Sequence, residues 1–79
     1  MMNIKKFRNE IENIIECKVG SLHGGEMLSE LEDWDSLAVL AFIAMIDKNF
    51  GIILDAEKIT NCKTVDDLGA LLGDLISRK

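Results

Sequence analysis

The chain has 79 residues, of which 48% are hydrophobic and 29% are charged, and it contains no proline. This apolar fraction excludes extended disorder and is enough for one small core, so we expect a single domain over residues 1–79. The formal net charge is −5 and the lysines and arginines are scattered, which argues against a nucleic-acid partner.

The sequence also bears on the cellular setting. No apolar run approaches the roughly 20 residues of a membrane span, and the amino terminus does not have the pattern of a signal peptide. Cys17 and Cys62 stand alone, without the spacing of a metal or redox motif. They could pair in a secreted protein, but small buried or half-buried side chains in a reducing compartment are more common. We therefore expect a cytoplasmic monomer without a membrane span.

A first helix is predicted from Asn3, a suitable N-cap, to Cys17 or Lys18. Charged residues there alternate with one apolar stripe at helical spacing, formed by Ile4, Phe7, Ile11, Ile14 and Ile15. The periodicity fails between Val19 and Asp35, where glycines indicate a long loop. Apolar residues along this loop suggest that it packs on the domain, with a short helical turn around residues 27–32.

A second helix is predicted over residues 36–49, and Gly51 is placed to end it. At 100° per residue, an inward side is predicted from Val39, Ile43, Ile46 and Phe50, flanked by Leu40 and Phe42. The opposite arc holds Leu37, Ala38, Ala41, Ala44, Met45 and Lys48. A helix that is apolar nearly all round is either buried or presents its second face to a partner.

The rest of the chain predicts a connector and two more helices. Residues 52–54 form an extended apolar connector, and Asp55 caps a short helix over residues 56–60 with Ile59 pointing inward. Thr64 and Asp67 resemble a capping box that opens the last helix. Its apolar stripe is Val65, Leu68, Leu71, Leu72, Leu75 and Ile76, and the basic residues after Ser77 would complement its dipole.

Ser36 has an ordinary explanation as the N-cap of the second helix. A nucleophilic serine would need a general base, and the only histidine, His23, lies in a glycine-bearing loop without a Gly-x-Ser-x-Gly motif. We therefore expect no catalytic residues. Asp33 and Asp35 suggest a calcium loop, but Ala38 and Ala44 stand where that motif requires glycine and glutamate. No metal site is predicted.

The stretch Asp35-Ser36-Leu37 resembles the signature of acyl carrier proteins. Trp34, Phe50-Gly51, Ile59-Thr60 and Thr64-Val65 extend the resemblance over nearly the whole chain. It implies an all-α, four-helix bundle with a long loop between helices one and two and a short third helix. It also implies a 4′-phosphopantetheine arm from coenzyme A on the Ser36 hydroxyl, carrying an acyl or aminoacyl group as a thioester.

The resemblance further implies partners and a non-enzymatic role. A phosphopantetheinyl transferase would contact Asp35, while Asp35 and Leu37 flank the attachment point. Acyl-loading and acyl-transferring enzymes would meet the second helix. A long acyl chain could shelter in an apolar interior formed by Leu40, Ile43, Ile46, Ile59, Leu68 and Leu72.

The chain departs from fatty-acid carriers on the second helix. Ala38 and Ala41 stand at positions that are commonly acidic in that family, and Lys48 replaces another acid. We predict a partner face chosen by apolar contacts and formed by Leu37, Ala38, Ala41, Met45 and Lys48. This favours a specialised lipid, polyketide or other secondary pathway over bulk fatty acid biosynthesis. Two alternatives stay open: this arc packs on the loop under Trp34, or the chain is an unmodified helical interaction module.

Overall fold

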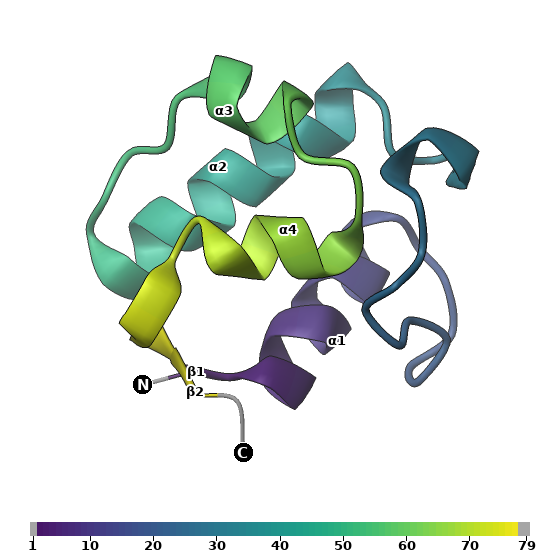
Figure 1. The fold of residues 1–79 in the computed structure, drawn as a ribbon, viewed down its shortest axis with the longest axis horizontal. Coiled ribbons are helices and arrows are strands. Elements are labelled where there is room, and N and C mark those ends of the chain that lie inside the picture. The colour runs from purple at the N-terminus through teal and green to yellow at the C-terminus, as the bar shows by residue number, and fades with distance from the viewer. Residues whose placement is uncertain (1, 78–79) are drawn as a thin grey trace.

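The computed structural model describes residues 2–77 and shows a small helical bundle (Figure 1). The α-helices are α1 (Ile4–Ile14), α2 (Ser36–Phe50), α3 (Ala56–Thr60) and α4 (Val65–Ala70). Single 3-10 turns occur at Leu28–Glu30 and Gly73–Leu75. The predicted all-α bundle, with its long first loop and short third helix, is confirmed. None of the helices within residues 2–77 is both long and apolar enough to cross a membrane.

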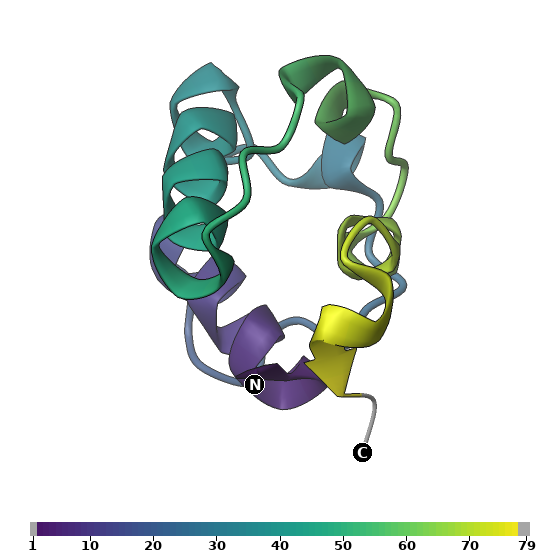
Figure 2. The ribbon, with the colours of Figure 1, turned by 90° about the vertical axis from the view of Figure 1, so that its left-hand side faces the viewer.

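The core lies between the four helices, which surround it in Figure 2. Each helix contributes side chains with no exposed surface, namely Phe7 and Ile11 of α1, Phe42 and Ile46 of α2, Ile59 of α3, and Val65 and Leu68 of α4. The rings of Phe7 and Phe42 meet edge-on, with centroids 5.9 Å apart and planes at 83°. This geometry suits the opposite charges of a ring edge and a ring face.

Three helix starts follow the predicted capping residues, but α1 ends at Ile14, before the predicted Cys17 or Lys18, because the backbone leaves the helix and Glu16 has φ of 58°. The Asn3 side chain accepts a 2.7 Å hydrogen bond from the Lys6 N–H, and the Asp55 carboxylate accepts one of 2.9 Å from Glu57. Thr64 and Asp67 form the expected capping box at the start of α4. Gly51 ends α2 in a left-handed conformation with φ of 69°, where glycine avoids the cost that a Cβ would bring.

The predicted orientation of α2 was wrong in part. The fully buried side chains are Phe42 and Ile46, and Ala38 is only 5% exposed although it was assigned to the outer arc. Leu40, predicted to point inward, is 61% exposed. This orientation follows from Phe42, whose ring packs between those of Phe7 and Trp34. The side of α2 that carries Phe42 therefore faces the core.

The carboxyl-terminal segment also differs from its prediction. The helix ends at Ala70, Leu75 is 40% exposed, and Gly73 adopts a left-handed conformation with φ of 54°. Beyond Gly73 the chain becomes extended, and β2 (Ile76–Ser77) pairs in parallel with β1 (Met2–Asn3). Met2 and Ile76 pair in register and are both buried. α4 therefore ends well before the basic residues that were expected to complement its dipole. Those residues, 78–79, lie outside the described residues.

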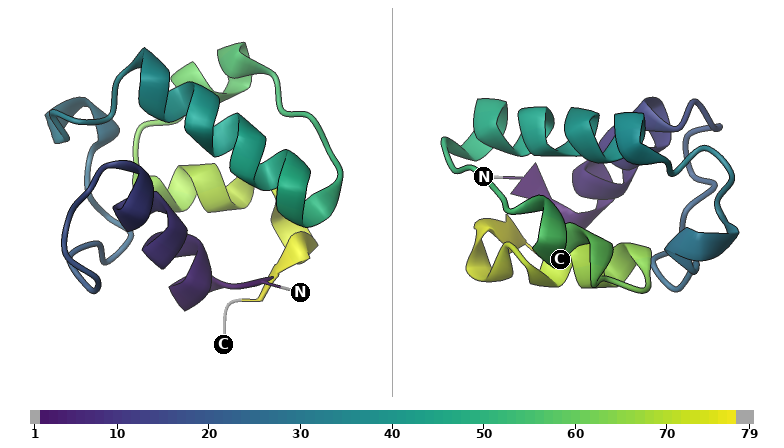
Figure 3. Two further views of the ribbon diagram at one scale, coloured as in Figure 1. Left: turned by 180° about the vertical axis from the view of Figure 1, so that it is seen from behind. Right: turned by 90° about the horizontal axis from the view of Figure 1, so that it is seen from above.

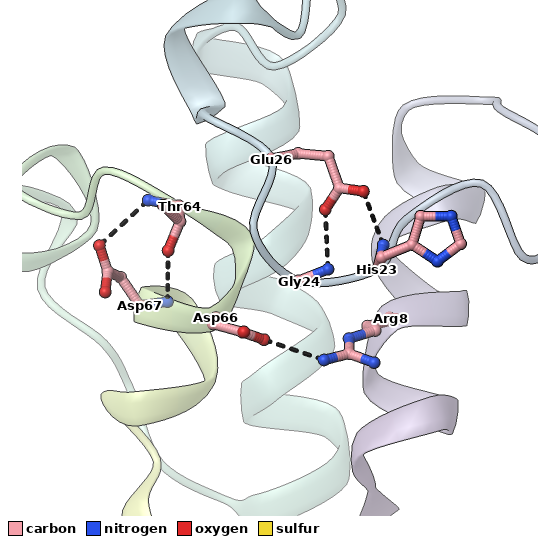
Figure 4. A network of polar contacts seen from close by, with 7 residues as sticks. All are labelled: Arg8, His23, Gly24, Glu26, Thr64, Asp66 and Asp67. Atoms are coloured by element: carbon pink, nitrogen blue, oxygen red, sulfur yellow. Dashed lines mark hydrogen bonds and ion pairs between the residues drawn. The ribbon is translucent and has the colours of Figure 1, made fainter.

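Two buried or half-buried groups on α1 hold the long loop. Glu12 is fully buried, and its Oε2 accepts a 2.8 Å hydrogen bond from the Leu22 N–H. Arg8 forms a 3.1 Å ion pair with Asp66 of α4, directly beneath the backbone of Gly24 (Figure 4). The Gly24 carbonyl accepts a 2.9 Å hydrogen bond from the Asp66 N–H. The loop is thus fixed to both α1 and α4.

A turn within the loop is closed by Glu26. Its carboxylate accepts hydrogen bonds from the N–H groups of His23 and Gly24, at 2.6 and 2.8 Å (Figure 4). Burial acts to raise the pKa of Glu26, but these backbone hydrogen bonds outweigh it and the pKa is lowered. His23 is exposed and contributes its backbone to this turn, as a loop residue would.

Candidate functional site

The site that the sequence singled out lies where the long loop meets α2. Asp35 is the N-cap of the helix, and its Oδ1 accepts a 3.0 Å hydrogen bond from the Ala38 N–H. Ser36 is the first helical residue, so the interpretation of Ser36 as the N-cap was wrong. Because Asp35 takes the capping role, the Ser36 hydroxyl is not needed to satisfy the helix end.

The Ser36 side chain is available to other molecules. Ser36 is exposed, and its hydroxyl makes no hydrogen bond with any other of residues 2–77. It lies at the amino terminus of a 15-residue helix, where unpaired N–H groups give a partial positive charge. An anionic group attached to this hydroxyl would therefore lie in a favourable field.

A hollow of about 390 Å³ opens beside Ser36, between α2 and α3. Trp34 and Val39 line it from the α2 side, and Ile59 and Cys62 line it from the α3 side. Its walls are mainly apolar, so it suits the uncharged part of a flexible arm or its cargo. Of the residues expected to shelter a cargo, Ile59 lines this hollow, whereas Leu40 points to solvent.

Cys62 is the thiol nearest to this arrangement, as one of the residues that line the hollow. Burial raises its pKa, and the negative charge of Asp67 raises it further. Its Sγ lies 3.4 Å from the Lys58 carbonyl, in position to donate a hydrogen bond. A thiol held neutral in this way is a poor nucleophile. Cys17 and Cys62 are both free and half-buried, as predicted.

The predicted partner face on α2 is divided by the structure. Leu37 is 73% exposed, and Ala41 and Lys48 are exposed as well. Ala38 is buried, so its assignment to an outer face was wrong. Met45 is half-buried: it packs against the core and also lines a surface hollow together with Ala41 and Lys48.

Sequence reasoning missed two contributors to this region. Leu40 is exposed although a helical wheel without a known core direction placed it inward. The end of α1 also lies against the start of α2, because Ile14, Ile15 and Glu16 line a hollow together with Leu37 and Ala41. Hydrophobic periodicity within α1 predicted its buried stripe, but no local signal indicates which helix lies beside it.

Compared with models of protein families, residues 5–72 match the family described as "Phosphopantetheine attachment site". The chain belongs to this phosphopantetheine-binding family. Its members bind 4′-phosphopantetheine covalently, which confirms the predicted cofactor. The match extends from α1 through α4 and includes the whole of α2. Searches among curated proteins and among solved structures returned no match.

The geometry at the start of α2 fits the group that this family carries. The exposed Ser36 hydroxyl offers a free oxygen for attachment, and the helix terminus offers partial positive charge to a phosphate. The hollow between α2 and α3 offers room beside it. Attachment at this position would disturb no hydrogen bond of the described structure.

Proposed function

We propose that this chain is an acyl carrier protein whose Ser36 holds the 4′-phosphopantetheine arm. One observation carries the proposal: the Ser36 hydroxyl is exposed and unbonded at the start of a long helix, within the stretch Asp35-Ser36-Leu37. The arm supplies a thiol that holds an acyl or aminoacyl group as a thioester. The chain itself presents this cargo to partner enzymes and performs no catalysis.

The other serines in the matched range are weaker candidates. The Ser21 hydroxyl donates a 2.6 Å hydrogen bond to the Lys18 carbonyl, so its modification would break a turn. Ser29 is exposed and lines the same hollow as Ser36, but it lies within a single 3-10 turn. Only Ser36 among the three begins an α-helix and receives its electrostatic support. This comparison favours Ser36 on physical grounds.

Asp35 and Leu37 have separate proposed roles beside Ser36. Asp35 fixes the first turn by capping it, and it remains exposed to a phosphopantetheinyl transferase. Leu37 offers the transferase or a later partner an apolar contact, since it is 73% exposed. Asp35 thus fixes the turn of helix that bears Ser36, and Leu37 is free to contact a partner.

We further propose a specialised pathway in the cytoplasm. The exposed side of α2 shows Leu37, Ala41 and Ala44, with Asp47 and Lys48 as its charged neighbours. Such a face suits enzymes that select by shape and apolar contact more than by a basic patch. The free Cys17 and Cys62 thiols fit a reducing compartment.

Intact mass spectrometry tests the attachment point. After incubation with coenzyme A and a broad-specificity phosphopantetheinyl transferase, the wild type should gain the mass of one phosphopantetheine. Ser36→Ala should gain none while keeping its helical circular dichroism, and the matched variant Ser29→Ala should be modified like the wild type. Modification that persists in Ser36→Ala would overturn the assignment, and a wild type that is never modified would favour an unmodified interaction module.

A further inference from the structure

Two polar side-chain atoms on α1 are buried, and neither makes a hydrogen bond with another of residues 2–77. They are Nε of Arg8 and Oε1 of Glu12. The guanidinium Nε–H can only donate a hydrogen bond, and a carboxylate oxygen can only accept one. Arg8 and Glu12 lie four residues apart, a spacing that makes their side chains neighbours on one side of the helix. A donor and an acceptor, each without a protein partner, therefore lie on the same buried side of α1.

Both side chains lie beneath the same short stretch of the long loop. Glu12 accepts the Leu22 N–H through Oε2 at 2.8 Å, and a Cβ added to Gly24, two residues further on, would collide with the Arg8 guanidinium. Figure 3 (left) shows the loop turning back alongside α1 before it continues to the start of α2. The two atoms are thus enclosed between α1 and the loop.

The hydrogen bonds that these side chains do make leave both atoms unsatisfied. Arg8 pairs with Asp66 of α4 through Nη2, at 3.1 Å (Figure 4). Glu12 uses Oε2, its other oxygen, for the loop. A buried guanidinium N–H or carboxylate oxygen without a hydrogen bond costs more free energy than a neutral group would. A small molecule placed between the two atoms would remove both costs.

The chemistry of the two atoms selects this molecule. It must accept a hydrogen bond from Nε–H and donate one to a carboxylate oxygen. It must also be neutral, because the guanidinium of Arg8 repels a cation and the carboxylate of Glu12 repels an anion. Water meets all three conditions, and an internal water joins polar groups that are too far apart to bond directly.

We propose that one internal water molecule joins Arg8 Nε to Glu12 Oε1. The water completes a polar chain that begins at Asp66 of α4, passes through Arg8, the water and Glu12, and ends at the Leu22 N–H. Every link of this chain involves an ionised group, and such hydrogen bonds are stronger than neutral ones. The chain fixes residues 22–24 of the loop to α1 and α4.

The fixed stretch supports the wall of the hollow beside Ser36. Leu22 and Leu28 are the buried apolar side chains of the loop, at 6% and 4% exposed. Leu28 also lines the hollow between α2 and α3. Residues 22–24 lie a few positions before Leu28, so the polar chain orders the loop on the approach to this wall. The proposal concerns the folded chain itself and does not depend on modification of Ser36.

Nuclear magnetic resonance of the isotope-labelled protein tests the water directly. The Arg8 Nε–H should show a cross-peak to water that has the sign of the diagonal in a NOESY spectrum and the opposite sign in a ROESY spectrum. A water held for longer than the protein takes to tumble gives this pattern, whereas chemical exchange gives the same sign in both. A crystal structure should place an ordered water within hydrogen-bonding distance of both atoms. A direct Nε–Oε1 hydrogen bond, or no such cross-peak, would overturn the proposal.

A matched pair of variants distinguishes a bridging water from ordinary hydration of the guanidinium. Glu12→Met removes the acceptor and keeps an unbranched side chain that suits a buried position, so the cross-peak should disappear. Asp66→Asn changes the other partner of Arg8 and leaves the bridge intact, so the cross-peak should persist. Circular dichroism checks that both variants are folded. A cross-peak that persists in Glu12→Met, or that is lost equally in both variants, would contradict a water held by Glu12.

Hydrogen exchange of the Leu22 amide tests whether Arg8 and Glu12 act through the same water. Arg8→Lys keeps the positive charge but lacks Nε–H, and Glu12→Gln keeps an oxygen for the Leu22 N–H. Each should speed exchange by about tenfold, and the double variant should lie within about twofold of either one. Independent effects would instead multiply to about a hundredfold and would refute the bridge. Glu10→Gln, which breaks the ion pair of Glu10 with the exposed Lys6, is the control and should change the rate by less than about twofold.

Discussion

The indole of Trp34 meets the ring of Phe42 edge-on, with centroids 5.9 Å apart and planes at 69°. Phe42 meets Phe7 in the same manner, so three aromatic side chains connect the long loop to α1 through α2. Trp34 packs against the core through this contact. Leu37 and Ala41 are exposed, so the loop does not cover them.

Phe42 should therefore dominate the stability of the bundle. Phe42→Ala is expected to lower the free energy of unfolding by about 3–5 kcal/mol, and Ile46→Ala by about 2–5 kcal/mol, since both side chains are fully buried. Leu40→Ala is the control on the same helix and should cost little, because Leu40 is 61% exposed. Urea titrations monitored by Trp34 fluorescence measure all three. A Leu40→Ala loss equal to that of Ile46→Ala would mean that the assigned faces of α2 are wrong.

The division of roles between Asp35 and Ser36 leads to a second prediction. Asp35→Ala removes the side-chain cap of α2 and should cost about 0.5–2 kcal/mol of stability. Ser36→Ala should leave the thermal midpoint nearly unchanged, because the Ser36 hydroxyl makes no hydrogen bond within residues 2–77. Differential scanning calorimetry of both variants makes the comparison. A larger loss in Ser36→Ala than in Asp35→Ala would return the capping role to the serine.

Adjacent glycines in the loop should respond differently to alanine. Gly24 is buried with φ of 113°, and an added Cβ would collide with the side chains of Asp66 and Arg8. Gly25 is exposed, and its added Cβ would meet nothing within 4 Å. Gly24→Ala should therefore destabilise the protein by more than about 1 kcal/mol, while Gly25→Ala should be nearly neutral. Equal thermal midpoints for the two variants would show that the loop is not held over the ion pair.

Local features of the fold were predictable from the sequence because their partners lie a few residues away. Asn3 caps α1 through Lys6, and Thr64 and Asp67 complete a capping box across three residues. Gly51 ends α2 in a left-handed conformation, and this preference belongs to glycine itself, so it needs no distant partner. The motif at Ser36 was predictable for the same reason, since it is a run of adjacent residues.

Features that depend on distant residues were not predictable from periodicity. The side of α2 that faces the core is chosen by Phe7 and Trp34, which come from other elements. Glu12 is a charged residue of the predicted first helix, yet it is fully buried, and its carboxylate accepts a hydrogen bond from the Leu22 N–H ten residues away. The pairing of Met2 with Ile76 joins the two ends of the described chain. Each case requires knowledge of which segments meet.

The last prediction concerns the stability of the protein at acidic pH. It follows from two carboxylates that accept backbone hydrogen bonds. The backbone N–H groups of Lys63 and Thr64 lower the pKa of Asp67 below its ordinary value of 3.8. The pKa of Glu26 is lowered from 4.5, because the hydrogen bonds from His23 and Gly24 outweigh burial. In both cases the folded state favours the ionised form, so the unfolded state binds more protons at acidic pH.

Stability from Glu26 should thus be fully present above its ordinary pKa of 4.5 and should be lost as the pH falls through its lower folded value. Glu26→Gln should destabilise the protein near pH 7, since the two N–H groups bond to separate carboxylate oxygens, whereas a neutral amide offers one oxygen acceptor and accepts less strongly. The difference from wild type should narrow as the pH falls below 4.5. Glu32→Gln is the matched control, because Glu32 is exposed and makes no hydrogen bond or ion pair with another of residues 2–77. Thermal midpoints of both variants and of the wild type, measured from pH 7 to below pH 4.5, test this prediction. A loss of stability in Glu26→Gln that stays constant with pH would mean that the ionised carboxylate does not hold the turn.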